Sequence, residues 1–305
     1  MKIFYHQNYN IDFGLFNRLH PFDGKKFAHI YQQIQKLTGI EIIAPDKPIT
    51  QNEIEHFSDA LLPSLLKKKR YVLKALEVPY IPLLPFSFID KHILQPMRWG
   101  VAGTLAASRE ALNGQACWNL AGGYHHASRG AAEGFCIYND IGISLDVLKQ
   151  QGHINDETKI LIIDVDAHHG NGNSYVFEEN PNVTLLDIYN DDIYPNNNFT
   201  KKRIDINIPL RIGTRGKEYL DKLSAGLAKL SSDYDMAYVV AGTDVIESDP
   251  LGGLKLTLDD CLQRDIVVFE TLNKLNIPTV FLGSGGYSKD SATAITQSIS
   301  RLYKN

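Results

Sequence analysis

The residues of this chain most suited to chemistry begin with an acid and imidazole string, DVDAHH, at positions 164–169. In an extended segment, side chains two residues apart point to the same face, so Asp164, Asp166 and His168 can face one ligand. A catalytic zinc takes about three nitrogen or oxygen ligands and keeps one position open. Asp166 and His168 supply two, and Asp244 is the candidate third, because the small residues before it allow close approach. This set predicts a zinc site, although such an oxygen-rich site also accepts Fe²⁺.

A histidine pair and a tyrosine follow glycines elsewhere in the chain. His125 and His126 come after two glycines, and Tyr287 comes after Ser-Gly-Gly. Glycine lets the backbone turn sharply and lie close to a ligand. A histidine beside a bound water can take its proton and later protonate a leaving amine, and a phenolic hydroxyl can donate to a developing oxyanion. Each motif alone also fits a structural loop, and the 164–169 string also fits the cap of a helix beginning near Asn171.

The elements before these residues must hold them together. Short apolar runs predict strands buried on both faces of a parallel sheet, at 116–120, 159–165, 183–188, 236–241 and 278–282. Helical spacing occurs at 141–151, 217–230 and 258–275. The N-terminal third adds expected strands at 2–5 and 41–44 and helices at 61–76 and 92–112. Alternating strands and helices imply an α/β sheet flanked by helices. Ligands bind outside the carboxyl ends of such strands, so the motifs are expected to share one rim.

Composition limits the remaining classes of function. The chain has 305 residues, 44% of them hydrophobic, without repeats or linker-like stretches, so one domain over 1–305 is expected. It shows no signal-peptide pattern and no apolar run near the ~20 residues of a membrane span, which predicts a cytoplasmic location. The three separated cysteines are expected to be reduced and mostly buried. A net charge of −4 disfavours nucleic acid as a partner, and the basic run 67–70 is expected to be a solvated helix face.

In combination, these strings resemble a histone deacetylase. The matching strings are GGYHHA (122–127), GFCIYNDI (134–141), DVDAHHGNG (164–172), AGTDVIESDPLGGL (241–254) and SGGY (284–287). Further strings are similar to the class IV branch of that family: Tyr9-Asn10-Ile11, His20-Pro21-Phe22-Asp23, DIYNDDIYP (187–195) and the asparagine of HHGNG. The resemblance covers roughly residues 3–303. It implies a three-layer arginase/deacetylase-like fold with a mainly parallel central sheet between helices.

The resemblance assigns a role to each matching residue. Zinc is expected on Asp166, His168 and Asp244. The expected catalytic groups are His126 as general base and acid with Asn171 as its partner, His125 paired with Asp164, and Tyr287 polarising the substrate carbonyl. The expected lining of the lysine tunnel is Gly134, Phe135, Tyr194 and Leu251. A structural potassium ion is expected on the backbone carbonyls of Asp164, Asp166 and His168 and the Asp187 side chain.

The implied reaction is hydrolysis of an N-acyl-lysine amide in a protein or peptide, by water whose pKa a metal lowers towards ~7. Three features depart from the class I pattern of the family. Asn171 replaces an aspartate, Lys25 or Lys26 replaces the arginine of the acetate cavity, and 79–90 offers no counterpart of the acidic rim residue. Class IV relatives remove long fatty acyl groups, so the resemblance leaves two activities open, removal of an acetyl group and removal of a long fatty acyl group.

Two other functions fit the same residues. One is a small-molecule amidohydrolase, for example for acetylated polyamines, and the other is a silent module that binds acyl-lysine without cleaving it. An arginase-like binuclear enzyme is disfavoured, because Asn171 and Thr243 stand where a second metal would need acids. The sequence does not fix the acyl length, the target protein or the oligomeric state.

Overall fold

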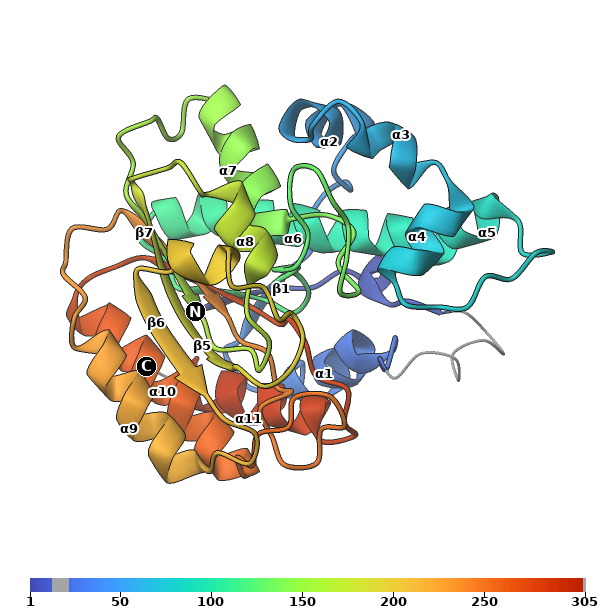
Figure 1. Ribbon diagram of the computed structural model, residues 1–305. Coiled ribbons are helices and arrows are strands. Elements are labelled where there is room, and N and C mark those ends of the chain that lie inside the picture. The colour runs from blue at the N-terminus through green and yellow to red at the C-terminus, as the bar shows by residue number, and fades with distance from the viewer. Residues whose placement is uncertain (13–21, 304–305) are drawn as a thin grey trace.

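The strands of the chain form one sheet with parallel neighbours throughout. The computed structural model describes residues 1–12 and 22–303, so His20 and Pro21 of the class IV comparison lie outside it. Across the sheet the strands run in the order β2-β1-β3-β8-β7-β4-β5-β6 (Figure 1). Their bounds are β1 Lys2–Phe4, β2 Glu41–Ile43, β3 Cys117–Asn119, β4 Ile160–Asp164, β5 Val183–Asn190, β6 Ile206–Leu210, β7 Met236–Val240 and β8 Thr279–Leu282. The parallel α/β fold expected from the apolar runs is therefore confirmed.

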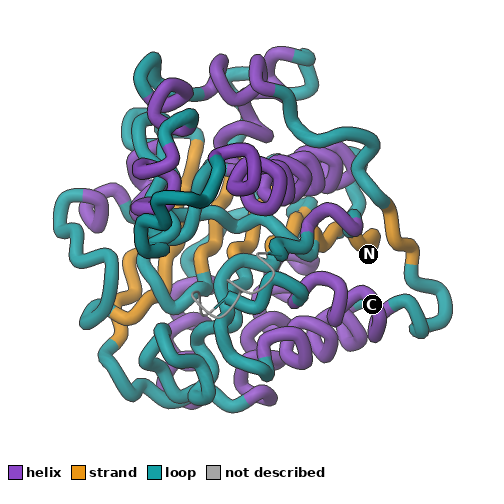
Figure 2. The backbone as a smooth tube through the Cα atoms, turned by 90° about the vertical axis from the view of Figure 1, so that its right-hand side faces the viewer, coloured by secondary structure: helices purple, strands orange, loops and turns teal. Residues whose placement is uncertain are grey.

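Helices cover both faces of this sheet and make three layers, as the two views in Figures 1 and 2 agree. In β4, Leu161 and Ile163 pack in a core cluster with residues of α1, α9, α10 and α11, whereas Ile160 and Ile162 pack with residues of α6 and α7. This alternation follows from the two-residue period of a strand. The helix bounds are α1 Lys26–Ile34, α2 Gln51–Phe57, α3 Leu62–Leu66, α4 Lys69–Ala75, α5 Phe86–Ile89, α6 Gln95–Leu112, α7 Asp140–Gln150, α8 Asn171–Val176, α9 Gly216–Leu227, α10 Leu258–Lys274 and α11 Ser291–Leu302.

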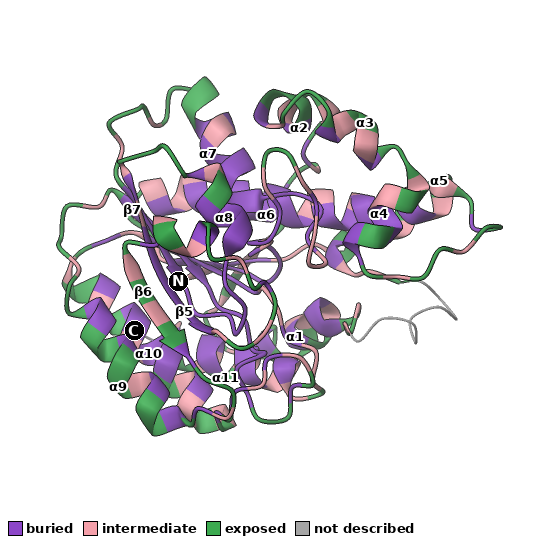
Figure 3. Cartoon of the chain, viewed as in Figure 1, coloured by how far each residue is buried: buried purple, intermediate pink, exposed green. Residues whose placement is uncertain are grey.

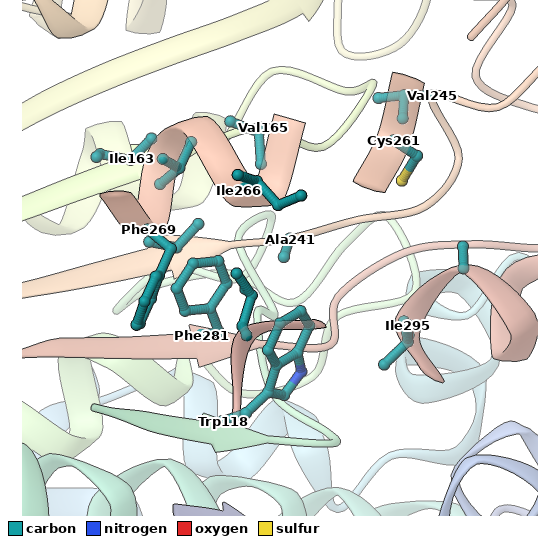
Figure 4. Packing of buried hydrophobic residues seen from close by; sticks show 14 of the residues in the cluster. Trp118, Ile163, Val165, Ala241, Val245, Cys261, Ile266, Phe269, Phe281 and Ile295 are labelled. Atoms are coloured by element: carbon teal, nitrogen blue, oxygen red, sulfur yellow. The ribbon is translucent and has the colours of Figure 1, made fainter. Parts of the chain in front are cut away.

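The centre of the sheet is buried, as the purple colouring of Figure 3 shows. β4, β7 and β8 are buried along their whole length, and Trp118 of β3 stacks on Phe281 of β8 with ring centroids 4.8 Å apart (Figure 4). The three cysteines are free and buried, as expected. Among the described residues, the search for a helix long and apolar enough to span a membrane finds none.

Two helix predictions need correction. The helix expected at 61–76 is broken into α3 and α4, with Lys67 and Lys68 at the break. The basic run 67–70 is therefore not one solvated helix face, since the Lys69 ammonium binds three backbone carbonyls between α4 and α5. The helix expected at 92–112 begins earlier, in a π-helical turn at Asp90–Leu94 that leads into α6.

Candidate metal centre

The residues selected from the sequence meet at the carboxyl edge of the sheet. Asp164 is the last residue of β4, and its neighbour β7 leads to Asp244. β3 leads to the histidine pair, and β8, beside it, leads to Tyr287. Because parallel strands end at the same edge, four loops distant in sequence contribute to one site.

Asp166, His168 and Asp244 form a compact, buried cluster of metal-ligating atoms. One atom from each residue lies within 4.8 Å of the others, and all three residues are buried. His168 Nδ1 lies 2.8 Å from Asp244 Oδ2 and 3.2 Å from Asp166 Oδ1. Ligands about 2.0–2.2 Å from a shared zinc ion have separations of this size. The donor set therefore fits a zinc-type cation.

Electrostatics favour positive charge at this cluster. Burial and the neighbouring Asp166 carboxylate both raise the pKa of Asp244. Burial opposes a charged His168, but the two carboxylates outweigh it and raise its pKa to about 10. Two buried carboxylates side by side repel each other, and a cation between them relieves that repulsion.

Backbone N–H groups, a serine hydroxyl and a close glycine fix the two carboxylates in place. Asp166 Oδ2 accepts from the Ser284 hydroxyl at 3.0 Å and from the Gly285 backbone N–H at 3.1 Å. Asp244 Oδ1 accepts from the Ala167 N–H at 2.9 Å. A Cβ on Gly242 would lie 1.9 Å from Asp166 Oδ2, so only glycine fits there. Each carboxylate thus keeps an oxygen oriented toward the shared centre.

The two adjacent histidines have different partners. His125 Nδ1 lies 2.7 Å from the Asp164 carboxylate, and His126 Nδ1 lies 2.7 Å from the Asn171 amide oxygen. Burial disfavours a charged His125, but Asp164 and Asp166 outweigh burial and raise its pKa to about 9. Burial and the nearby positive charge of His125 and His168 hold the pKa of His126 well below its usual value. The two pKa shifts favour the charged form of His125 and the neutral form of His126.

Glu133, which the sequence comparison did not select, stands behind this pair. The Asn171 amide nitrogen donates to Glu133 Oε1 at 2.6 Å. A carboxylate is therefore hydrogen-bonded to the neutral side chain that pairs with His126. An amide oxygen accepts but does not donate, so Asn171 Oδ1 requires the proton of His126 on Nδ1. This arrangement leaves Nε2 of His126 without the proton and able to accept one.

The loop that carries Tyr287 is held from two sides by residues that sequence reasoning did not single out for this purpose. Asp249 Oδ2 accepts from the backbone N–H groups of Tyr287 at 2.6 Å and Ser288 at 3.1 Å. The buried Lys26 ammonium donates to the carbonyls of Ser284 at 2.9 Å and Gly285 at 3.2 Å. The acid before Pro250 was the only sequence signal for Asp249. Of the two lysines expected near the acyl cavity, Lys26 is buried against Ser284 and Gly285, which line the pocket, and Lys25 is exposed.

Comparison with known proteins identifies the family. The model of the histone deacetylase domain matches residues 20–302. The chain belongs to the histone deacetylase family. Arabidopsis thaliana histone deacetylase 2 is 34% identical over 308 residues, covering 99% of this chain and 78% of that protein. The Bacillus subtilis acetoin utilization protein AcuC is 31% identical over 172 residues, covering 52% of this chain and 43% of that protein.

A solved structure supports the fold of this deacetylase-family chain. The HD domain of HDA15 superposes with a TM-score of 0.78 at 19% identity, covering 100% of this chain and 91% of that one. The expected three-layer arginase/deacetylase-like fold is therefore confirmed.

A deep apolar pocket opens onto the metal cluster of this deacetylase-family chain. Its cavity volume is about 80 Å³. Among its lining residues are both histidines, Asp166, Tyr287 and the expected tunnel residues Gly134 and Phe135. Its wall also includes apolar side chains: Ile11, Phe22, Phe27, Leu76, Val78, Ile93 and Met97. The lining of the pocket is therefore mainly apolar.

The other two expected tunnel residues lie differently. The Tyr194 ring packs edge-on against His126 with ring centroids 5.1 Å apart, and 42% of Tyr194 is exposed. Leu251 lies on the turn that Asp249 caps through the Leu251 N–H at 2.9 Å, outside the residues that line the pocket. Tyr194 thus contacts the histidine, but neither Tyr194 nor Leu251 is among the residues that line the pocket.

A second group of polar atoms lies at the ends of β4 and β5, where the structural potassium ion is expected. Asp164 and Asp187 are paired in register on β4 and β5, and both line one small cavity. Asp187 Oδ2 accepts from His169 Nδ1 at 2.7 Å and from the Gly170 N–H at 3.0 Å. Asp187 Oδ1 is buried without a hydrogen-bond partner. An unpaired buried carboxylate oxygen is costly, and a cation would satisfy it.

Proposed function

We propose that residues 1–305 form one catalytic domain that hydrolyses N-acyl-lysine amides in proteins or peptides. The observation that carries the proposal is the buried cluster of Asp166, His168 and Asp244, whose Asp166 lines the same pocket as His126 and Tyr287. Membership of the histone deacetylase family supports hydrolytic deacetylation.

The metal would be held by the two aspartates and His168, with zinc as the proposed ion and Fe²⁺ as the alternative. When bound, the ion supplies Lewis acidity, which polarises the amide carbonyl and lowers the pKa of water. The orphaned oxygen of Asp187 supports a structural potassium ion at the second site, with Asp164, Asp166 and His168 offering backbone carbonyls.

The remaining steps belong to side chains of this chain. His126 takes a proton on Nε2 from the attacking water and later gives it to the departing lysine amine. Asn171 holds the tautomer that makes this transfer feasible. His125, charged through Asp164, stabilises negative charge that develops beside it. The Tyr287 hydroxyl donates a hydrogen bond to the oxyanion, a role that suits its pKa, which burial raises well above the usual value.

Pocket shape supports a long acyl group. Phe135 and Gly134, with Tyr194 and Leu251 toward the rim, would enclose the lysine stem. The apolar wall of the pocket, which includes Phe27 from α1, can contact a hydrocarbon chain. We therefore propose a class IV type fatty deacylase, with cytoplasmic location as a prediction from composition.

The decisive experiment measures lysine release from acyl-lysine peptides by the zinc-loaded protein. Tyr287→Phe is expected to lower kcat about 10²–10³-fold, and His126→Ala about 10²–10⁴-fold. Tyr175→Phe, at an exposed tyrosine outside the pocket, is the matched control and should be unaffected. Undiminished turnover in either site variant would defeat the proposal.

Substrate class is tested with the same protein. Acetyl-, octanoyl- and myristoyl-lysine peptides are compared with an acetylated polyamine at equal concentration. A long-chain preference is the expected result. Faster turnover of the polyamine would favour the small-molecule amidohydrolase, and bound zinc without hydrolysis of any compound would favour the silent binding module.

A further inference from the structure

The connection between α4 and α5 presents apolar side chains to solvent. Its sequence at 79–85 is PYIPLLP, and the three prolines leave few backbone N–H groups to satisfy. Leu83 is 95% exposed and Tyr80 is 50% exposed. This apolar tip, residues 79–85, projects from the molecule beside α4 and α5 in Figure 1, and Figure 3 colours it mostly as exposed. Folding therefore leaves the apolar area of Leu83 and part of that of Tyr80 available for contact with a partner.

Lys69 holds the apolar tip in this exposed form. Its ammonium donates to the carbonyls of Ile81 at 3.1 Å, Pro82 at 2.7 Å and Leu84 at 3.0 Å. The same ammonium lies 4.7 Å from the centroid of the Tyr80 ring, and the Arg70 guanidinium lies 5.5 Å from it. A buttressed tip loses little conformational freedom when it docks, which favours binding.

The chain segment that carries the apolar tip is positively charged. Arg70 and Lys74 are exposed on α4, the helix before the tip, and Lys67 and Lys68 are exposed in the break between α3 and α4. Residues 61–91 carry six lysines and arginines and two acids, a net charge of +4 in a chain of −4, which leaves −8 on the rest. One of the two acids, Asp90, lies 3.7 Å from Arg98. The charge of this segment is therefore opposite to that of the remaining chain.

We propose that the apolar tip and its basic surroundings dock the protein on an anionic lipid bilayer. Leu83 would enter the acyl boundary, Tyr80 would lie at the headgroup level, and the lysines and arginine would bind lipid phosphates. The tip is convex, and a protein that recognises an apolar segment offers a groove for it, whereas a bilayer accepts a projection directly. Charge complementarity with the anionic leaflet selects the lipid surface.

This docking would place the active site at the membrane. Leu76 and Val78 precede the tip, Ile93 follows it, and all three line the pocket. The Phe135 N–H also donates to the Ala75 carbonyl at the end of α4, at 3.0 Å. An acyl-lysine close to the bilayer surface would thus meet the pocket mouth. Lipid binding itself does not depend on turnover, so it is tested separately from the proposed function.

The test is co-sedimentation of the full chain with vesicles of phosphatidylcholine alone or with about 30% phosphatidylserine. Binding is expected only with phosphatidylserine, and it should weaken as salt rises. Leu83→Glu, and separately Lys67→Glu with Lys68→Glu, should each reduce binding about tenfold or more. Hydrolysis of a soluble acyl-lysine peptide by Leu83→Glu should stay within about twofold of the unsubstituted chain, which shows an intact fold.

Ile212→Glu provides the matched control. Ile212 is 64% exposed and follows β6, which lies at the opposite side of Figure 1 from α5, so this variant should bind vesicles normally. Equal loss in Ile212→Glu and Leu83→Glu would overturn the proposal, because general acidity would explain both. Absence of phosphatidylserine-dependent binding by the unsubstituted chain would also overturn it and would assign the apolar tip to a protein partner.

Discussion

At the residue scale, the chemistry depends on what stands behind each histidine. The two neighbouring imidazoles favour different protonation states, because His125 has a carboxylate partner and His126 has an amide partner. Their pKa values accordingly move in opposite directions, upward for His125 and downward for His126. One histidine can therefore provide fixed positive charge while the other moves the proton.

Asn171→Asp is expected to shift the pH dependence of the reaction. A carboxylate beside His126 stabilises the protonated imidazole and raises its pKa. The base works only when it is deprotonated, so activity would be lost at a higher pH as the solution is acidified. The acid limb of kcat/KM should move up by about one pH unit. Glu133→Gln removes the charge behind Asn171 and should move the same limb down, so coincident limbs in all three proteins would contradict the assignment.

Asp249→Asn is expected to lower kcat through Tyr287. The carboxylate fixes the Tyr287 and Ser288 N–H groups, and an amide cannot accept as many hydrogen bonds with the same geometry. Displacement of the hydroxyl should reduce kcat about 10–10²-fold with little change in KM.

A double-mutant cycle separates this role from general destabilisation. Asp249→Asn should cost little more in a protein that already carries Tyr287→Phe, because both changes remove one function. Asp290→Asn is the matched control, since Asp290 accepts from the exposed Ser248 hydroxyl and not from the Tyr287 backbone. Additive losses would show that Asp249 acts elsewhere.

At the element scale, the sequence predicts the buried strands and the edge strand β2, but it misses the other edge strand, β6. β4, β7 and β8 are apolar throughout because both faces are covered, so their positions are visible without the structure. β6 was missed because this edge strand alternates polar and apolar residues and contains Pro209. The break between α3 and α4 was missed because apolar spacing continues across Lys67 and Lys68.

The residues of the candidate site also divide into those that the sequence predicts and those that it does not. The strand-end residues could be selected, since the parallel sheet brings them to one edge. Glu133 and Asp249 could not be selected, because each acts through hydrogen bonds to residues far away in sequence. Asp140 is a third example, whose carboxylate accepts from the N–H groups of Gly123 and Tyr124 before the histidine pair. Such support is set by tertiary contacts that local spacing does not encode.

Gly103→Ala in α6 tests how closely the helix must approach the sheet. Alanine favours a helix by about 1 kcal/mol over glycine. Its Cβ would nevertheless lie 1.9 Å from the buried Tyr9 hydroxyl and 2.5 Å from Asn119 Oδ1. We expect a net loss of about 1–3 kcal/mol in the free energy of unfolding, measured by denaturant titration.

Gly226→Ala in α9 is the matched control for this prediction. The nearest atom to its added Cβ is Ile208 Cδ1 at 2.5 Å, the end of a flexible side chain that can move aside. We expect a change within about 0.5 kcal/mol. Equal stability of the Gly103→Ala and Gly226→Ala proteins would show that propensity, and not close approach, governs these positions.

At the scale of the whole molecule, the bound metal is expected to connect catalysis with stability. Asp166 and Asp244 leave different strands, so a cation on both ties β4 to β7 in the folded protein alone. A ligand that binds only the folded state stabilises it by about 4 kcal/mol at a thousandfold excess over its Kd. Chelation should therefore lower Tm by several degrees, and zinc should restore it. Asp244→Asn keeps an oxygen for the Ala167 N–H, so this variant should fold, but its Tm should no longer respond to zinc. A Tm that rises equally with zinc in both proteins would place the ion elsewhere and remove the basis of the proposed hydrolysis.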